Sequence, residues 1–540
     1  MNNDLIQVVN QPTDKGRELL KSVVTNISGN VYGFWPFVPA STVAAAMARL
    51  SRSPEDLRNN LLLEFPDEIK ELDQIKLLYE KVDQNKSSDL MKRVLTAYGD
   101  DSVQQLLPIQ LVIENTSNLM TKTIEWHRLG AYLEQSTRYI YFDQKQNGRY
   151  RYHTPEELSQ ADQKFYNSSM DLIFDNYSSL VTQLTNYIRV KNPKPIDKTE
   201  ILAWTGATRA QACDAARPLF PVATTSTVGV VANAQTIEYM IVSLLSNPLT
   251  EAQKLGLSIL KEVRKIYPVF FERADMPGRG LALSAYKSEI ARELSELSKS
   301  LPLTRGANFR PVRLLNTWPD FDQIYSNILF DQTKLDNLEI KNITDNYSPE
   351  EKQNLWDTFV GKRMNRRHKP GRALELIHYE WEIVGDYGTF RDLQRHRIVD
   401  DMRWQKLSPN LGYQIPELVI ESGLENLYRS TVDLSERLYN HLIQNYNQTI
   451  AQYACLLTHN MRYRFVINAR SLTHLLEIRT TPQGHPGYRK ICQEMYNQVM
   501  QATPEVAKMM KFVNKGEDPE LTRLASEQAT VKRLEELTRQ

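Results

Sequence analysis

The two halves of the chain carry the same short anchors in the same order. Trp126-His127-Arg128 in the first half corresponds to Arg395-His396-Arg397 in the second, and Asn233-Ala234 corresponds to Asn468-Ala469. A strand-like run precedes each Asn-Ala pair, so three anchors align in order. Such ordered anchors predict two diverged copies of one structural unit. The spacing between the anchors is larger in the first half, which places a helical insertion mainly in residues 154–210.

Length and composition indicate a globular protein with more than one core. The chain has 540 residues, too many for one ordinary core. Its 41% hydrophobic and 24% charged residues are typical of soluble globular proteins. The net charge of +1 gives no global attraction to nucleic acid or to an acidic membrane, so an anion site must come from local clustering.

The chain carries no sequence signal for a membrane, for secretion or for a metal. We find no run of about 18 apolar residues that would predict a membrane span. The first residues lack the basic and apolar regions of a signal peptide. Cys213, Cys455 and Cys492 are scattered without metal-type spacing and fit reduced cysteines. We therefore expect a cytoplasmic protein without a metal site.

Local patterns predict an alternation of helices and strands in both halves. We expect residues 1–40 to form an N-terminal arm, residues 41–300 the first copy with its insertion, and residues 301–540 the second copy. Asn233 and Asn468 are each expected to open a helix that follows a strand. Further expectations are strands at Thr224–Val231, Met461–Ile467 and Tyr139–Phe142, helices over 154–190, 250–266 and Ala373–Trp381, and a linker over Pro302–Pro319.

Two motifs have the chemistry of an anion site. Arg395-His396-Arg397 is a dense cluster of hydrogen-bond donors, and guanidinium groups suit phosphate and carbonyl oxygens. Ser136-Thr137-Arg138 offers a hydroxyl and a second guanidinium. Either motif could instead be a solvated basic patch or an ion-pair network. His396 could be a structural donor whose charge is suppressed by its neighbours.

Single residues near these motifs also have structural alternatives. Arg217 precedes Pro218 and could cap a helix end. Glu134 and Arg138 are four residues apart and could pair on a helix face. Asn468 could be a helix N-cap, a ligand-binding residue, or both.

A basic run over residues 363–372 could suggest nucleic-acid binding. It has no interleaved aromatic residues, and the chain has only one such run. We therefore expect no nucleic-acid partner.

The motifs together resemble a known family. A basic triplet, seven residues and then Ser-x-Arg-Tyr, as in Trp126-His127-Arg128 with Ser136-Thr137-Arg138-Tyr139, resembles the signature of the flavin-dependent thymidylate synthases. Ala216-Arg217 and Asn468-Ala469-Arg470 resemble two further segments of that family. The resemblance implies an α+β fold with two such domains, each a mixed or antiparallel sheet packed with long helices. Family members form homotetramers whose shared sites hold FAD, dUMP and a folate.

Carried over position by position, the resemblance divides one site between the two copies. The second copy lacks the dUMP-type motif, with Gln405 at the serine position, Leu407 at the arginine position and Gln452 where the first copy has Arg217. The first copy has Trp126 at the first position of the basic triplet and Gln235 in place of the flavin-type arginine. It has Leu244 in place of the dUMP-type arginine that ends the helix. The implied dUMP-binding residues are Glu134, Ser136, Arg138, Arg217 and Arg479, of which Arg138 and Arg479 are the implied catalytic pair. The implied FAD-binding residues are Arg395, His396, Arg397, Asn468, Arg470 and His474.

The implied activity is the reductive methylation of dUMP to dTMP. Methylenetetrahydrofolate would supply the carbon, FAD the hydride and NADPH the electrons for the flavin. A homodimer would imitate the family's tetramer. Asp100 and Arg372 stand near the family's histidine of a Gly-His turn. The alternatives are a non-catalytic homologue that binds a nucleotide or flavin, and a flavoenzyme that modifies another pyrimidine nucleotide.

Overall fold

A computed structural model describes residues 12–538, apart from 51, 52, 54, 83, 84, 99, 100, 139, 147, 302–309, 518–520 and 522. Asp100 and the start of its turn therefore lie outside the described residues. The chain forms two compact units, and each is discontinuous in sequence. The first unit comprises residues 1–180, 219–305 and 429–455, and the second comprises residues 181–218, 306–428 and 456–540.

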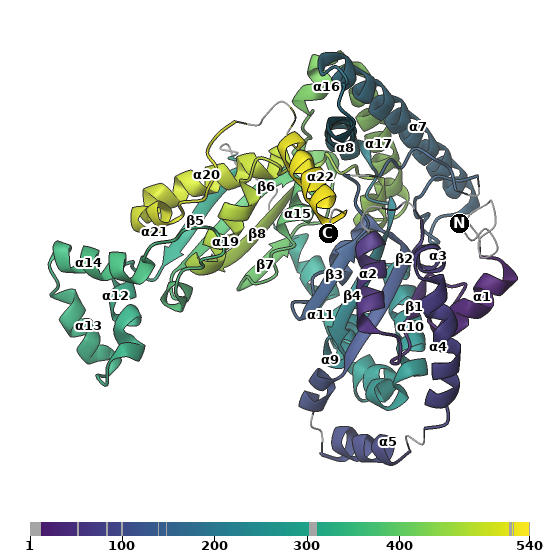
Figure 1. Ribbon diagram of the computed structural model, residues 1–540, viewed down its shortest axis with the longest axis horizontal. Helices are drawn as coiled ribbons and strands as arrows, with labels where there is room; N and C mark the ends of the chain where they lie inside the picture. Colours follow the sequence, from purple (N-terminus) through teal and green to yellow (C-terminus); the bar gives the residue numbers. More distant parts are fainter. Residues whose placement is uncertain are drawn as a thin grey trace. The chain divides into compact units, whose positions relative to one another are not determined.

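The first unit is built on a four-stranded antiparallel sheet (Figure 1). Its strands, in spatial order, are β1 (Val31–Gly33), β2 (Pro108–Ser117), β4 (Thr225–Asn233) and β3 (Gly130–Glu134). The central strands β2 and β4 are largely buried, which suits their β-branched sequences.

The second unit contains a sheet with the same antiparallel pairing and the same order of equivalent strands (Figure 1). Its strands, in spatial order, are β5 (Val312–Trp318), β6 (His378–Asp386), β8 (Asn460–Asn468) and β7 (Asp401–Trp404). Pro108 pairs with Asn233 in the first sheet, and His378 pairs with Asn468 in the second. The expected α+β fold with two antiparallel sheets is confirmed.

Equivalent helices follow equivalent strands. The helices α6 (Asn118–Ile124) and α15 (Tyr387–Leu393) follow β2 and β6, and α9 (Ala234–Leu245) and α19 (Ala469–Arg479) follow β4 and β8. Asn233 and Asn468 cap the last two through their side-chain oxygens, which accept backbone N–H bonds of 2.8 and 2.9 Å. The next helices are α10 (Thr250–Ile266), which matches its prediction, and α20 (Pro486–Ala502).

The long helices join segments that are distant in sequence. They are α7 (Gln160–Lys191), α8 (Lys198–Ala216) and α17 (Glu425–Asn445). The short helix α18 (Gln448–Ala451) follows α17. The first unit includes residues 429–455 of the second half: Asn176 donates to Thr431 Oγ1 at 3.0 Å, and the Tyr453 hydroxyl donates to Glu251. The second unit includes residues 181–218 of the first half, and the Thr458 N–H donates to Pro218 O at 2.8 Å. The two compact units therefore exchange helical segments along the chain.

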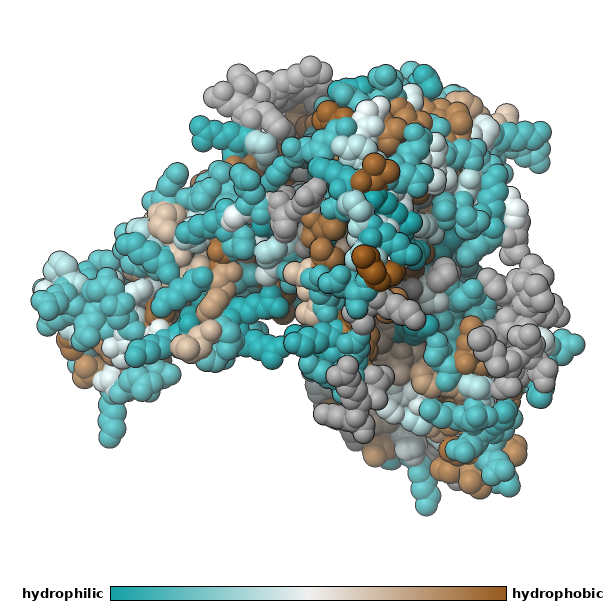
Figure 2. Space-filling model, turned by 45° about the horizontal axis from the view of Figure 1, so that its top comes forward, coloured by the Kyte–Doolittle hydropathy of each residue, from teal (hydrophilic) through white to brown (hydrophobic). Residues whose placement is uncertain are grey.

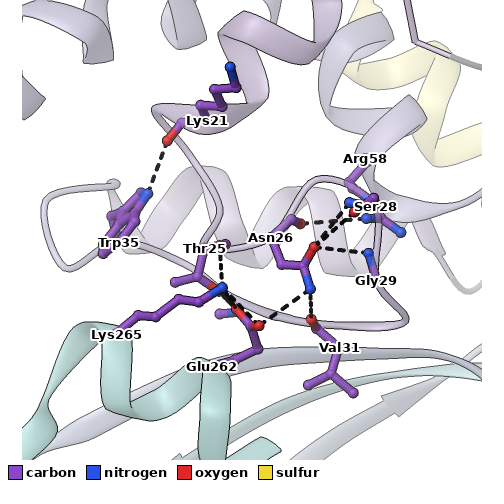
Figure 3. Close-up of polar contacts among 11 residues, drawn as sticks. Lys21, Thr25, Asn26, Ser28, Gly29, Val31, Trp35, Arg58, Glu262 and Lys265 are labelled. Carbon is purple, nitrogen blue, oxygen red and sulfur yellow. Dashed lines mark hydrogen bonds and ion pairs between the residues drawn. The ribbon is translucent and has the colours of Figure 1, made fainter. Parts of the chain in front are cut away.

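The N-terminal segment contributes to the first unit instead of forming a separate arm over its whole length. Residues 31–33 form the edge strand β1. Glu262 on α10, with 2% of its surface exposed, accepts hydrogen bonds from Thr25 (2.6 Å), Asn26 (3.3 Å) and Lys265 (2.8 Å) (Figure 3). A buried carboxylate satisfied in this way fixes the segment to α10.

The remaining helices cover the sheets or extend from them. In the first unit these are α1 (Asp14–Lys21), α2 (Ala40–Leu50), α3 (Leu57–Glu64), α4 (Pro66–Tyr79), α5 (Asn85–Lys92) and α11 (Gly280–Ser298). In the second unit they are α12 (Gln323–Leu329), α13 (Asn337–Asp345), α14 (Pro349–Val360), α16 (Glu417–Glu421), α21 (Pro504–Met509) and α22 (Leu524–Thr538).

Three local predictions were wrong. The segment Ala373–Trp381 is not a helix, because Tyr379 and Trp381 are buried on alternate positions of β6, a period of two. The expected linker over Pro302–Pro319 contains strand β5. Residues 140–142 are not a strand, and Tyr139 lies outside the described residues.

The face shown in Figure 2 is mostly hydrophilic, with hydrophobic residues scattered over it. Among the described residues, no helix combines the length and the apolar character needed to cross a membrane. The same residues contain no group of three or more His, Cys, Asp or Glu side chains placed to hold a metal ion. The three cysteines are free thiols and are buried.

Candidate functional site

The second unit brings the end of α19 to the basic triplet. Arg479 is the last residue of α19, and its Nε–H donates to Nε2 of His396 at 2.8 Å. A ring nitrogen that accepts this bond carries no proton, so His396 is neutral with its proton on Nδ1. Burial, followed by the charges of Arg479 and of neighbouring groups, lowers the pKa of His396 well below its usual value. The arginine is therefore oriented by a neutral imidazole.

His474 lies beside this pair on the same helix. Its ring is edge-to-face with that of His396, at 6.1 Å between centroids. Burial and the charge of Lys369 lower the pKa of His474. The guanidinium of Arg479 also lies over the Tyr488 ring at 5.2 Å, a cation–π contact that further restricts it.

Arg217 is held in the second unit by two carboxylates. Its Nη2 lies 3.2 Å from Asp392 Oδ2, and its Nε lies 3.8 Å from Asp214 Oδ1. Asp392 also lies 3.7 Å from Arg395 Nη1, and its charge acts on the pKa of His396. Arg217 is the first residue after α8, and it makes ion pairs with both carboxylates. One cluster joins a residue of the first half to the triplet of the second half.

The other residues implied for the flavin lie around the start of α19 and after α15. Asn468 is the N-cap of α19. Arg470 donates to Pro370 O at 3.0 Å and to Glu375 at 3.2 Å. Arg395 is 45% exposed at its side chain, and Arg397 is partly buried. Two of these guanidinium groups therefore have a carboxylate nearby, Arg470 with Glu375 and Arg395 with Asp392.

The Glu134, Ser136 and Arg138 motif lies in the first unit, at the end of β3. The Glu134 side chain is only 1% exposed and lies 3.1 Å from Lys122 Nζ, which also contacts Glu125 at 2.5 Å. The Ser136 hydroxyl accepts the Arg138 N–H at 3.2 Å. Glu134 and Arg138 therefore belong to a strand end and a turn, and not to a helix face as one alternative held.

Strand pairing corrects the alignment of the two copies by one residue. Gln135 N–H donates to Thr227 O, and Gln405 N–H donates to Arg462 O, each at 2.9 Å at the equivalent place in the two sheets. Gln405 therefore corresponds to Gln135 and not to Ser136. The tripeptide Lys406-Leu407-Ser408 stands where the first unit has Ser136-Thr137-Arg138, and one extra residue lies between the second triplet and its strand.

The first unit has uncharged groups where the second has its Arg479 pair. Leu244 is fully buried at the position of Arg479, and Tyr239 takes the position of His474. The His127 and Tyr239 rings are edge-to-face at 6.1 Å, and Lys287 lies over Tyr239 at 4.6 Å. Burial and the charge of Lys287 lower the pKa of His127 to about 4. The loss of arginines noted in the sequence is thus matched by a change in local chemistry.

Sequence reasoning missed two acidic neighbours of the candidate site. Asp214 and Asp392 both contact Arg217, and the signal for Asp392 was its place three residues before Arg395. The basic run around residue 363 was also incompletely interpreted, because Arg363 is buried and makes a two-point contact with Glu477 at 2.7 Å.

The predicted residues fall into two sets by compact unit. The first unit contains Glu134, Ser136 and Arg138. The second unit contains Arg217, Arg479 and the implied FAD set of Arg395, His396, Arg397, Asn468, Arg470 and His474.

Comparisons with known proteins give close relatives along almost the whole chain. A UPF0159 protein of Chlamydia pneumoniae is 32% identical over 521 residues, covering 95% of this chain and 97% of its own. A UPF0159 protein of Thermoplasma acidophilum is 28% identical over 510 residues, covering 89% of this chain and 97% of its own.

Solved structures align with a smaller part. A UMP/dUMP methylase from Streptomyces cacaoi, bound with 5-Br dUMP, is 16% identical with a TM-score of 0.29 and covers 37% of this chain and 93% of its own. The flavin-dependent thymidylate synthase from Helicobacter pylori, complexed with FAD and dUMP, is 17% identical with a TM-score of 0.28 and covers 38% of this chain and 99% of its own.

The family comparison spans both halves. The sequence model of the thymidylate synthase complementing proteins matches residues 38–269 and again residues 313–505. These ranges include both triplets and both Asn-capped helices, so the resemblance found in the motifs is confirmed. The chain belongs to the thymidylate synthase complementing protein family, the family of the flavin-dependent thymidylate synthases.

Proposed function

We propose that this protein is a flavin-dependent thymidylate synthase with a composite site. It methylates dUMP at carbon 5 to give dTMP, using methylenetetrahydrofolate as the carbon donor and NADPH as the reductant. Each half supplies the residues that the other lacks. The working assembly in this proposal is a homodimer.

The observation that carries the proposal is the position of Arg217. This arginine comes from the first half, yet it belongs to the second compact unit and contacts Asp392, which also contacts Arg395. The second half has Gln452 at the equivalent position and cannot supply that charge itself. The exchange of helical segments thus provides a physical route by which one half completes the site of the other.

Arg479 is the group that acts on the pyrimidine in this proposal. Its Nε–H is committed to His396, and its Nη groups make no hydrogen bond within the described residues. They are therefore the donors that remain for a carbonyl oxygen of the base. A fixed guanidinium stabilises negative charge that develops on the pyrimidine when carbon 5 attacks the donated one-carbon unit. Neutral His396 keeps the arginine oriented without adding a second charge.

Ser136 and Arg138 bind the phosphate of dUMP in this proposal. A hydroxyl and a guanidinium two residues apart suit two oxygens of one phosphate group. Glu134 holds Lys122 below this turn and fixes the end of β3.

The second unit fits FAD by the chemistry of its donors. Arg395, Arg397 and Arg470 offer guanidinium groups to a doubly charged pyrophosphate, and His474 lies one helical turn beyond Arg470. Bound FAD would supply the hydride that completes the methyl group. The protein's own residues bind, orient and exclude water.

Cys455 and Cys492 have no role as nucleophiles in the proposed reaction. Burial raises the pKa of the Cys492 thiol to about 12 and raises that of Cys455 further. A thiolate nucleophile is therefore not formed near neutral pH at either position. The proposed reaction needs none.

The test is rescue of a thymidine-requiring bacterial strain by the full chain. We expect the wild-type chain to rescue growth, and Arg479→Lys and Arg138→Ala to lose it, with product formation reduced roughly 100-fold or more. Arg464→Ala is the matched control, because this arginine is 47% exposed on β8 and pairs with Glu380. The visible absorption spectrum of the purified protein shows whether flavin is bound.

Each outcome distinguishes the alternatives. A colourless protein that binds dUMP but gives no rescue is a binding module, and the enzymatic proposal fails. A yellow protein that methylates another pyrimidine nucleotide but not dUMP overturns the choice of substrate. Loss of rescue in Arg464→Ala as well as in Arg479→Lys would mean that the assay reports folding and not the site.

A further inference from the structure

A partly buried arginine contacts the residue that precedes the turn carrying Ser136 and Arg138. Arg151 donates through Nη2 to the side-chain oxygen of Gln135, the residue just before Ser136. Its guanidinium lies 4.6 Å over the Phe142 ring, and its Nε is buried without a hydrogen-bond partner. No acidic side chain in the described part of the chain forms an ion pair with it.

Three buried arginines of this protein have an acidic partner, whereas Arg151 has no ion pair among the described residues. Arg58 lies 2.6 Å from Glu114, Arg217 lies 3.2 Å from Asp392, and Arg363 lies 2.7 Å from Glu477. Burial lowers the pKa of Arg151 to about 10, although Glu114 acts in the opposite direction. A guanidinium removed from water without an ion-pair partner costs several kcal/mol, so a bound anion would stabilise its charge.

The second unit lacks both the arginine at the position of Arg151 and the Ser-x-Arg motif. Thr225 N–H donates to Arg151 O in the first unit, and Asn460 N–H donates to Gly412 O at the equivalent place in the second. Gly412 therefore replaces Arg151 in the unit that has also lost the Ser-x-Arg turn. The arginine accompanies the motif that suits an anion.

Gln135 links Arg151 to the turn through a side-chain hydrogen bond. Its side chain accepts from Arg151 and donates to Ser53 O at 2.7 Å, and it is only 2% exposed. With Nη2 committed to Gln135, Nε and Nη1 make no hydrogen bond within the described residues. These two positions are the donors left for an anion.

We propose that Arg151 completes a phosphate site with Ser136 and Arg138, and that this site takes the phosphate of a nucleoside monophosphate. The proposal rests on the proposed function and extends it, because Arg151 matches none of the family motifs found in the sequence. The phosphate dianion supplies the ion-pair partner that the Arg151 guanidinium lacks among the described residues. Arg151 then distinguishes the nucleotide from its nucleoside.

The test compares Arg151→Met with Arg149→Met in the full chain. Arg149 is two residues away and exposed, and it donates to Thr154. Binding of dUMP, deoxyuridine and inorganic phosphate is measured by titration calorimetry. We expect Arg151→Met to weaken dUMP and phosphate roughly 10–100-fold and to leave deoxyuridine unchanged. Arg149→Met should bind all three as the wild type does.

A stability measurement separates binding from a structural role. Methionine keeps the packing over Phe142 and removes the charge, but it also leaves the buried Gln135 side-chain oxygen without its donor. The two effects oppose each other, so without phosphate Arg151→Met should melt close to the wild-type temperature. Added phosphate should raise the melting temperature of the wild type but not of the variant. Arg151→Lys keeps the positive charge but loses the paired N–H donors of the guanidinium, so it should retain part of the phosphate affinity.

The outcomes that overturn the inference are distinct from those that overturn the enzyme. Unchanged phosphate affinity in Arg151→Met, or equal loss of dUMP and deoxyuridine, refutes the phosphate role. So does an Arg151→Lys variant as weak as Arg151→Met. A wild-type chain that binds phosphate through Arg151 but does not turn over dUMP keeps the anion site and refutes the proposed reaction.

Discussion

The ion pair between Arg363 and Glu477 gives the sharpest test of how α19 is held. Both side chains are almost fully buried, at 3% and 2% exposure, and two bonds of 2.7 Å join them. Arg363 also donates to His368 O at 2.7 Å and to Met509 O at 2.9 Å. Glu477 lies two residues before Arg479, so this contact anchors the helix that presents the candidate catalytic arginine.

Replacing Arg363 by methionine leaves the Glu477 carboxylate buried without its counter-charge. Breaking a buried pair in this way costs about 3–5 kcal/mol. For a unit of this size, the corresponding fall in the melting temperature is roughly 6–20 °C. The double variant Arg363→Met, Glu477→Leu removes both charges and should recover most of the loss.

The assay is thermal and urea unfolding of the full chain, with Arg372→Met as the control. Arg372 pairs with Glu375, but its side chain is 82% exposed, so its removal should cost less than about 1 kcal/mol. A loss below about 1 kcal/mol for Arg363→Met would refute the reasoning. A double variant no more stable than the single one would show that the penalty is not that of an unpaired charge.

Two further predictions concern the first unit and the helix caps. The folded-state pKa of His127, about 4, lies below its unfolded value, so its contribution to stability is complete above pH 6.5 and is lost as the pH falls toward 4. His127→Phe should remove up to about 1.4 kcal/mol per pH unit of that slope in unfolding measured from pH 7 to 4.5, and an unchanged slope would contradict this. Asn468→Ala and Asn233→Ala should each cost about 1 kcal/mol in urea unfolding, since each removes one N-cap bond. If Asn468 also binds the flavin, Asn468→Ala should lose flavin absorption and Asn233→Ala should keep it. Equal flavin absorption in the two variants would mean that Asn468 only caps the helix.

Elements with a strong local signal could be predicted from the sequence. The Asn-capped helices after β4 and β8 follow from a β-branched or alternating run that ends in Asn-Ala, and the structure has both. Strand β6 was missed because Ala373, Leu374 and Leu376 resemble a helix start, although tertiary pairing with β5 and β8 decides the segment. Pairing across a sheet is invisible to a local pattern.

The site could be predicted in its residue types but not in its grouping. Arg395, His396 and Arg479 were identified from motifs, and the structure joins the last two directly. The carboxylates around Arg217 and the guanidinium of Arg151 carry no motif, and only three-dimensional contacts reveal them. The one-residue shift at Gln405 likewise required the hydrogen bonds of the sheet.

The exchange of segments 181–218 and 429–455 also limits how the polypeptide can be made. A ribosome that has finished the first 305 residues has not yet synthesised the helix that the first unit needs, so that nascent unit keeps apolar surface exposed until residue 455 emerges. A gene cut near codon 300 would yield two fragments, each carrying a segment that belongs to the other. Tethering both halves in one reading frame keeps the donated segments at high effective concentration throughout assembly.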